Sequence, residues 1–172
     1  MKTLTKISAT AILMIVFASS VFAQSAASAN ASATIITPIA IAQVTDMAFG
    51  NIAVQTGTGG TVILAPAGTR TTGGGGGVTL PTVTGTVTAA SFNVTGSGVS
   101  TYSIAFTGFP LTITSGLNTM LVSAPVSAPS GTGTLTAGAQ TVTVGATLTV
   151  AAAQPAGSYT SATPFTVTVN YN

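Results

Sequence analysis

The sequence predicts an all-β protein, an immunoglobulin-like antiparallel β-sandwich that follows a cleaved N-terminal signal peptide. Three observations support this fold class. Apolar and polar residues alternate along many short segments, whereas the apolar spacing of an amphipathic helix is nearly absent. Gly- and Pro-containing turn signals separate these segments. The chain is also rich in Val, Ile and Thr, whose branched side chains favour strands. Short strands between such turns are typical of a sandwich or a barrel, and we expect the sandwich.

The N-terminus has the features of a secretory signal peptide. Lys2 and Lys6 give a positive start, an apolar run covers residues 11–18, and small residues precede Gln24. The alternative is a membrane anchor, but the run is shorter than the roughly 20 residues that a spanning helix needs. We therefore predict that residues 1–23 are removed. The mature chain would be exported to the periplasm, the cell surface or the medium, without membrane insertion.

The alternating pattern begins directly after the predicted cleavage point. We expect residues 24–33 to be an Ala- and Ser-rich extension and residues 34–172 to be a single β-sandwich domain. One parity of apolar residues continues from the extension into the domain, interrupted by Pro38, which predicts an edge strand or a jointed one. These positions are Ala27, Ala29, Ala31, Ala33, Ile35, Ile39 and Ile41.

Further strands are expected along the rest of the chain. The alternation predicts them at Phe49–Val54, Thr61–Leu64, Ser91–Thr95, Val99–Phe106, Leu111–Ile113, Met120–Val122, Val142–Val150 and Phe165–Tyr171. Gly96-Ser97-Gly98 predicts a hairpin between the two strands that flank it. Gly145 marks a bulge or bend in its strand. Gly73–Gly77 is expected to be a surface loop, since neither a helix signal nor a Lys follows it to form a phosphate site.

The charged and reactive side chains are too few for catalysis. The sequence has no His, Cys, Glu or Trp, and after removal of the leader only Asp46 and Arg70 carry charge. General acid–base, thiol and metal chemistry lack their usual groups, so we expect no enzyme, no cofactor and no metal site. Nucleic-acid binding is not expected either, because it needs clusters of Lys and Arg. Asp46 and Arg70 could pair or be solvated separately, and the low net charge favours self-association.

A set of short motifs covers nearly all of residues 33–172. They are Ala33-Thr34-Ile35, Pro38-Ile39, Asp46, Phe49-Gly50-Asn51-Ile52, Pro66-Ala67-Gly68-Thr69-Arg70, Val78-Thr79-Leu80-Pro81, Ser130-Gly131-Thr132-Gly133-Thr134-Leu135 and Phe165-Thr166-Val167-Thr168-Val169-Asn170-Tyr171. Together they resemble one bacterial family of secreted proteins, the domain of unknown function 4402 family. The resemblance implies no activity and no catalytic residues.

A weaker resemblance, carried by Phe49-Gly50, Ala156-Gly157-Ser158-Tyr159 and the penultimate Tyr171, is to chaperone-assembled pilus subunits and spore-coat-U-like proteins. It implies that the last strand pairs first with a periplasmic chaperone and then beside a strand donated by a neighbour. The assembly strand would present Phe165, Val167, Val169 and Tyr171. The alternating positions from Ala27 to Ile41 would form the donor segment, because strand addition needs alternate side chains to fill a groove. Alternatively, Ala27–Ala33 is a tether and the last strand belongs to an ordinary core.

These observations predict a non-enzymatic structural or surface protein, a subunit of a pilus-like fibre or a surface layer. The alternative is a monomeric secreted binding module, an adhesin or glycan-binding domain, that uses the Thr-x-Thr repeats as a flat face. Those repeats are Thr82-Val83-Thr84, Thr141-Val142-Thr143 and Thr147-Leu148-Thr149.

Overall fold

The computed structural model describes residues 25–172, so the predicted signal peptide and Gln24 lie outside the described part. The chain divides into two units, one ending at Ile35 and the other comprising Ile36–Asn172. In the first unit, the described residues 25–35 form no strand and are exposed throughout. Regular structure starts only at Ala40, so the alternating pattern before it does not form the edge strand that we expected.

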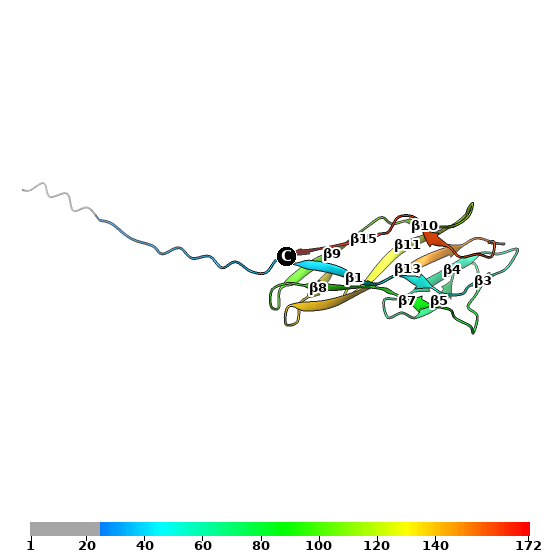
Figure 1. The fold of residues 1–172 in the computed structure, drawn as a ribbon, viewed down its shortest axis with the longest axis horizontal. Helices are drawn as coiled ribbons and strands as arrows, with labels where there is room; N and C mark the ends of the chain where they lie inside the picture. Colours follow the sequence, from blue (N-terminus) through cyan, green and yellow to red (C-terminus); the bar gives the residue numbers. More distant parts are fainter. Residues whose placement is uncertain (1–24) are drawn as a thin grey trace, which may run out of the picture. The chain divides into compact units, whose positions relative to one another are not determined.

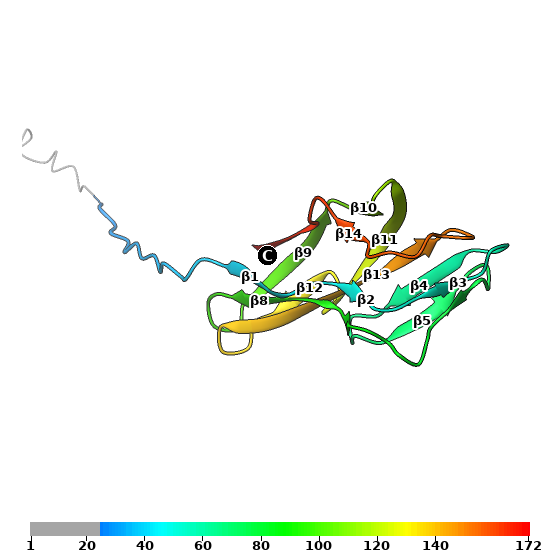
Figure 2. The ribbon, with the colours of Figure 1, turned by 45° about the vertical axis from the view of Figure 1, so that its right-hand side comes forward.

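The second unit is built entirely from strands and turns (Figures 1 and 2). Its strands are β1 (Ala40–Thr45), β2 (Ala48–Phe49), β3 (Ala53–Val54), β4 (Gly60–Leu64), β5 (Arg70–Gly73), β6 (Val78–Thr79), β7 (Val87–Thr88), β8 (Ala90–Thr95), β9 (Thr101–Thr107), β10 (Leu111–Ser115), β11 (Asn118–Ala128), β12 (Thr132–Thr134), β13 (Ala139–Val150), β14 (Thr160–Ser161) and β15 (Thr166–Tyr171). The predicted all-β class is confirmed.

Two antiparallel sheets pack face to face. The larger has the order β1-β8-β13-β11-β10-β14, with β4 and β5 also joined to β13. The smaller has the order β12-β9-β15. The orders β1-β8-β13-β11 and β9-β15 follow the A-B-E-D and C-F orders of an immunoglobulin-like sandwich. In that fold a strand G lies beside F, but within residues 25–172 no strand takes that place beside β15.

Strand β13 is the centre of the larger sheet, because it pairs with β8, β11 and β4. Its inward side chains have the predicted parity: Val142, Val144, Ala146, Leu148 and Val150 are all buried. The structure explains Gly145 differently from the sequence. A Cβ at this position would lie 2.1 Å from the Leu64 carbonyl oxygen, so glycine permits close approach of the chain after β4. The register shift lies opposite, between Ser123 and Val126 of β11.

The hairpin predicted at Gly96-Ser97-Gly98 is wrong. The two flanking strands exist as β8 and β9, but β8 pairs with β1 and β13, whereas β9 pairs with β12 and β15. The glycine-rich turn therefore carries the chain from one sheet to the other. Phe49–Val54 likewise forms two separate strands, β2 and β3, which pair with β7 and β6.

The core has two clusters of buried side chains. The first lies between the sheets, with Ala90, Val94, Val142 and Val144 from the larger sheet and Tyr102, Ile104, Val167 and Val169 from the smaller, together with Leu135. The second lies on the larger sheet and contains Val62, Val78, Leu111, Val122, Ala146, Leu148 and Val150. The second cluster is covered mainly by partly buried residues of loops and short strands, and this difference shapes the candidate site.

Candidate assembly site

Strand β15 presents an open backbone edge. It pairs with β9 on one side and, within the described chain, with no strand on the other. The Asn172 N–H donates to the Thr101 carbonyl at 3.2 Å. Because hydrogen bonding alternates along an antiparallel ladder, even-numbered residues of β15 direct their N–H and C=O groups toward β9. The odd-numbered residues, including Val167 and Val169, therefore direct theirs toward the open edge.

The same odd-numbered residues carry the apolar face of β15. Val167 and Val169 are 6% and 7% exposed and belong to the cluster between the sheets. Phe165 and Tyr171 are partly buried and pack against it. All four predicted assembly residues therefore line one core. A buried face joined to an open edge is the arrangement that favours addition of another strand.

The predicted donor segment is divided between two environments. Ala27, Ala29, Ala31, Ala33 and Ile35 are exposed, and Ile35 is 98% exposed. In contrast, Ile39 and Ile41 pack against the cluster between the sheets of their own domain. The part of this segment available to another molecule therefore ends near Ile35.

The junction between these environments lies beside the end of β15. The Tyr171 hydroxyl donates a hydrogen bond of 2.8 Å to the Thr37 carbonyl and accepts one of 2.6 Å from the Ser97 N–H. These contacts fix the first residues of the folded unit next to Tyr171. The folded unit therefore begins at the Tyr171 end of β15, and the extension is attached to it there.

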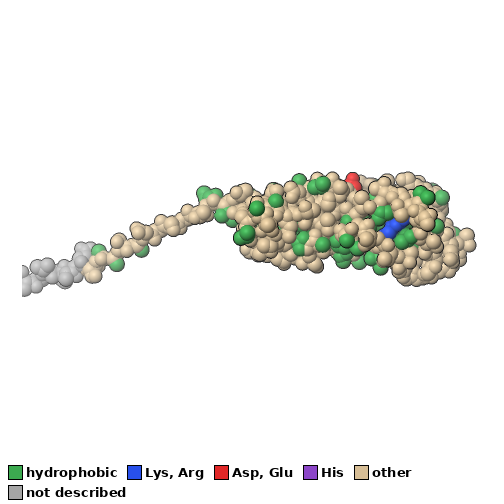
Figure 3. All heavy atoms as spheres, turned by 90° about the horizontal axis from the view of Figure 1, so that it is seen from below, with side chains coloured by type: hydrophobic (Ala, Val, Ile, Leu, Met, Phe, Trp, Pro, Cys, Tyr) green, Lys and Arg blue, Asp and Glu red, His purple; other side chains and the backbone are tan. Residues whose placement is uncertain are grey.

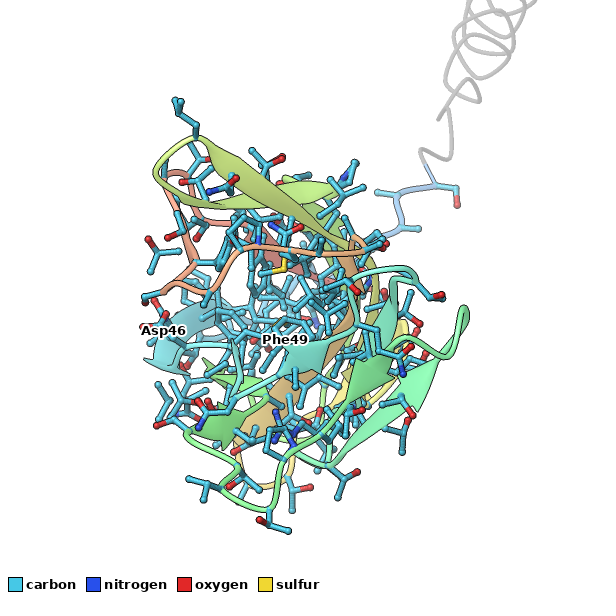
Figure 4. All side chains as sticks on the ribbon, turned by 90° about the vertical axis from the view of Figure 1, so that its right-hand side faces the viewer. Asp46 and Phe49 are labelled. Carbon is cyan, nitrogen blue, oxygen red and sulfur yellow. The ribbon has the colours of Figure 1, made fainter. Side chains whose placement is uncertain are left out.

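An open groove of about 1190 Å³ lies at the other end of β15, where Phe165 and Pro164 form part of its lining. Part of its apolar lining comes from residues 47–54 and part from strands β10, β11 and β13 of the larger sheet. These residues are Met47, Phe49, Ile52, Val54, Leu111, Ile113, Met120, Val122, Leu148 and Val150. In Figure 4, Asp46 lies at the left edge of the folded domain and Phe49 near its centre. Asp46 is the single charged residue among the lining residues.

Arg70 fixes one wall of the groove. Its guanidinium donates to the carbonyls of Phe49, Asn51 and Thr84, the last two at 2.7 and 3.2 Å. Asp46 instead accepts a hydrogen bond from the Gln43 side chain. The two charges are therefore not paired with each other, and Arg70 is a structural clamp rather than a solvated loop charge. This role of Arg70 could not be predicted from the sequence, because the three carbonyls come from segments distant from Arg70.

The opposite wall is the loop before β15. The Tyr159 hydroxyl donates to the Pro155 carbonyl at 2.7 Å and accepts from the Gln154 amide, which also donates to the Thr119 carbonyl. At the base of this loop, the rings of Phe165 and Phe109 lie 4.9 Å apart. Both walls are thus held by hydrogen bonds and aromatic packing, while the space between them stays open.

The outer face of the larger sheet forms a second candidate surface. One row across the strands contains Thr112, Leu121, Thr149 and Thr61, each directly opposite the next. The adjacent row contains Ser123, Thr147, Ile63 and Thr71. Neither row has a charged residue. Of the predicted Thr-x-Thr repeats, those in β13 contribute to this sheet, whereas Thr82–Thr84 lies outside any strand.

Charged side chains are few in the described part of the chain. The face in Figure 3 shows one small basic and one small acidic patch on an otherwise uncharged surface. Residues 25–172 contain no group of three or more His, Cys, Asp or Glu side chains placed to hold a metal ion. No helix in that part of the chain is long and apolar enough to cross a membrane.

Comparison with protein families gives one match. A family model described as "Domain of unknown function (DUF4402)" matches residues 39–171. The match spans β1 to β15 and thus includes the open edge, the groove and the Thr-rich face. No curated protein and no solved structure matches the chain.

Proposed function

Because the chain belongs to the family of the domain of unknown function DUF4402, whose description assigns no activity, we propose its function from the geometry. The protein is a non-enzymatic, exported structural subunit of a pilus-like fibre or a surface layer. Copies join when the extension before Ile36 of one molecule adds as a strand to β15 of another.

The observation that carries this proposal is the open edge of β15. The backbone groups of Val167 and Val169 face that edge, while their side chains form part of the core. Unpaired backbone groups beside buried apolar residues cost free energy, and an added strand removes that cost through ladder hydrogen bonds. The extension has an alternating apolar pattern and is exposed from residue 25 to Ile35.

The same edge gives a reason for a chaperone. A subunit with an uncovered apolar edge aggregates unless another chain protects it. A periplasmic chaperone that adds a temporary strand to β15 would provide this protection until a second subunit replaces it. This step agrees with the predicted export of the chain.

Deletion of residues 24–33 tests the proposal. The matched control replaces residues 24–33 with a Gly/Ser sequence of equal length, which keeps the spacing but removes the alternating side chains. We expect both proteins to fold, as judged by circular dichroism. By sedimentation we expect the full chain to form oligomers and neither variant to do so. Normal oligomers from either variant, or a monomeric full chain at high concentration, would overturn the proposal.

The Thr-rich face supports one alternative function. A flat, uncharged surface of hydroxyl and methyl groups that continues across four strands suits a binding module for a neutral polar ligand such as a glycan. Thr149→Arg, at the centre of the first row, would block that face and leave the distant β15 edge unchanged. Loss of surface adhesion in this variant, together with a monomeric full chain, would favour the binding module over the structural subunit.

A further inference from the structure

Building on the proposed strand addition, we propose how the added strand is arranged. Residues 29–35 of a second copy lie antiparallel to β15, with Ile35 opposite Phe165 and Ala29 opposite Tyr171. Ala31 and Ala33 then cover the core beside Val169 and Val167, and Ile35 enters the apolar groove.

Side-chain parity restricts the register. Directly opposite residues of an antiparallel pair point to the same face. The inward residues of β15 are odd-numbered, and so are Ala29, Ala31 and Ala33 of the extension, so odd-numbered residues must face each other. A shift by one residue would place Ser and Asn side chains against the core. The registers that remain differ from one another by an even number of residues.

The change in available space selects one of these registers. The cluster that contains Val167 and Val169 is already packed against Ile39 and Ile41 of the acceptor's own chain. Small alanine side chains suit this part. Space for a large side chain begins at Phe165, which lines the groove of about 1190 Å³. Ile35, 98% exposed in the isolated subunit, therefore belongs opposite Phe165 rather than opposite Val167.

The length of the segment agrees with this placement. Residues 29–35 span roughly 20 Å when extended, and β15 with Phe165 covers the same number of residues. Neither residues 29–35 nor residues 165–171 include a charged side chain, and Asp46 is the single charged residue of the groove lining. Addition therefore requires little desolvation of charge.

The antiparallel direction follows from where the extension leaves the fold. The acceptor's own folded unit begins beside Tyr171, at one end of β15, so its extension is attached at that end. An antiparallel donor brings its folded unit to the Phe165 end, so the acceptor's extension stays free to join a third copy. This repeat gives an open chain of subunits. A parallel donor would bring its folded unit to the Tyr171 end, where the acceptor's own extension is attached.

Engineered disulfides test the register directly, because the chain has no cysteine. In the proposed arrangement Ser32 lies opposite Thr168, and both side chains point outward. Thr168 hydrogen-bonds toward β9, so this pair is of the non-hydrogen-bonded type, whose side chains are closest and suit a disulfide. Ser32→Cys and Thr168→Cys are made in separate chains, mixed and mildly oxidised. The control mixture is Asn30→Cys with Thr168→Cys, displaced by two residues.

We expect a disulfide-linked dimer from the first mixture and its loss in the control mixture. A disulfide-linked dimer that forms in the control mixture but not in the first mixture, while oligomers form normally, would overturn the proposed register. Strand addition itself would remain supported. A disulfide formed within one chain carrying both substitutions, with none between chains, would show that the subunit completes its own sheet. Absence of any disulfide together with monomeric protein would overturn both this inference and the proposed function.

Discussion

The Tyr171 hydroxyl donates a hydrogen bond to the Thr37 carbonyl at 2.8 Å, across 134 residues of sequence. The same oxygen accepts from the Ser97 N–H at the turn that connects the two sheets. One side chain at the end of the last strand therefore ties together the start of the folded unit and the connection between its sheets. The turn depends on glycine here, since a Cβ at Gly96 would lie 2.2 Å from the Tyr171 hydroxyl oxygen.

Tyr171→Phe should destabilise the fold by about 1–3 kcal/mol, because it removes both hydrogen bonds and leaves the Ser97 N–H without this acceptor. The ring keeps its packing against the core. Urea unfolding gives the free energy of unfolding. Tyr159→Phe is the matched control, which removes a hydroxyl bonded only near the groove. Equal stability of Tyr171→Phe and the wild type would show that the junction is held by packing alone.

Arg70→Lys should loosen the groove wall. A lysine ammonium cannot reproduce the planar arrangement with which Arg70 reaches the carbonyls of Phe49, Asn51 and Thr84. We expect a loss of about 1–3 kcal/mol in the free energy of unfolding, with faster amide exchange at Asn51, whose N–H donates to Thr84. Unchanged exchange at Asn51 would show that strand pairing alone fixes this wall.

The stability should depend on Tyr102 at high pH. Burial raises the pKa of this tyrosine above its usual value near 10. Between the pKa of the unfolded chain and the higher pKa of the folded one, the unfolded chain binds fewer protons, so stability falls as pH rises. Tyr102→Phe removes this dependence, although it also loses the 2.6 Å bond to the Gln140 side chain.

Tyr102→Phe should therefore be less stable than the wild type at pH 7, with a difference that narrows above about pH 10. Thermal unfolding across this pH range measures both effects. A constant difference between the two proteins at every pH would contradict the assignment to Tyr102.

Two parts of this structure illustrate how far the sequence predicts it. The alternation in β13 and β15 correctly predicted which residues face the core, because side-chain direction depends only on local backbone geometry. The pairing of β8 and β9 could not be predicted in the same way. Gly96-Ser97-Gly98 indicates a turn, but whether the chain returns to the same sheet depends on β1, β13 and β15, which are distant in sequence.

The candidate site shows the same limit. The apolar residues of the last strand were predicted, but its open edge follows from the strand order of the whole sheet. The groove was not predicted, because its lining comes from segments between Gln43 and Phe165 that are far apart in sequence. The split of the donor segment at Ile35 also depends on tertiary packing, since Ile39 and Ile41 have the same parity but belong to the core.

Ile35→Ser should weaken self-association without changing the stability of the isolated subunit, because Ile35 is 98% exposed there. Leu117→Ser is the matched control, since Leu117 is 100% exposed in the turn between β10 and β11. Sedimentation at several concentrations measures association, and thermal unfolding measures stability. Equal weakening by the two substitutions would indicate general surface hydrophobicity rather than a specific role of Ile35.

Amide hydrogen exchange at β15 tests strand addition most directly. Thr168 and Asn170 bond toward β9 and should be protected in both the isolated subunit and the assembled protein, which makes them internal controls. The Val167 and Val169 amides face the open edge. We predict that they exchange rapidly in the isolated subunit and become protected on assembly. Rapid exchange of both valine amides in the assembled protein would contradict the addition of a strand at this edge.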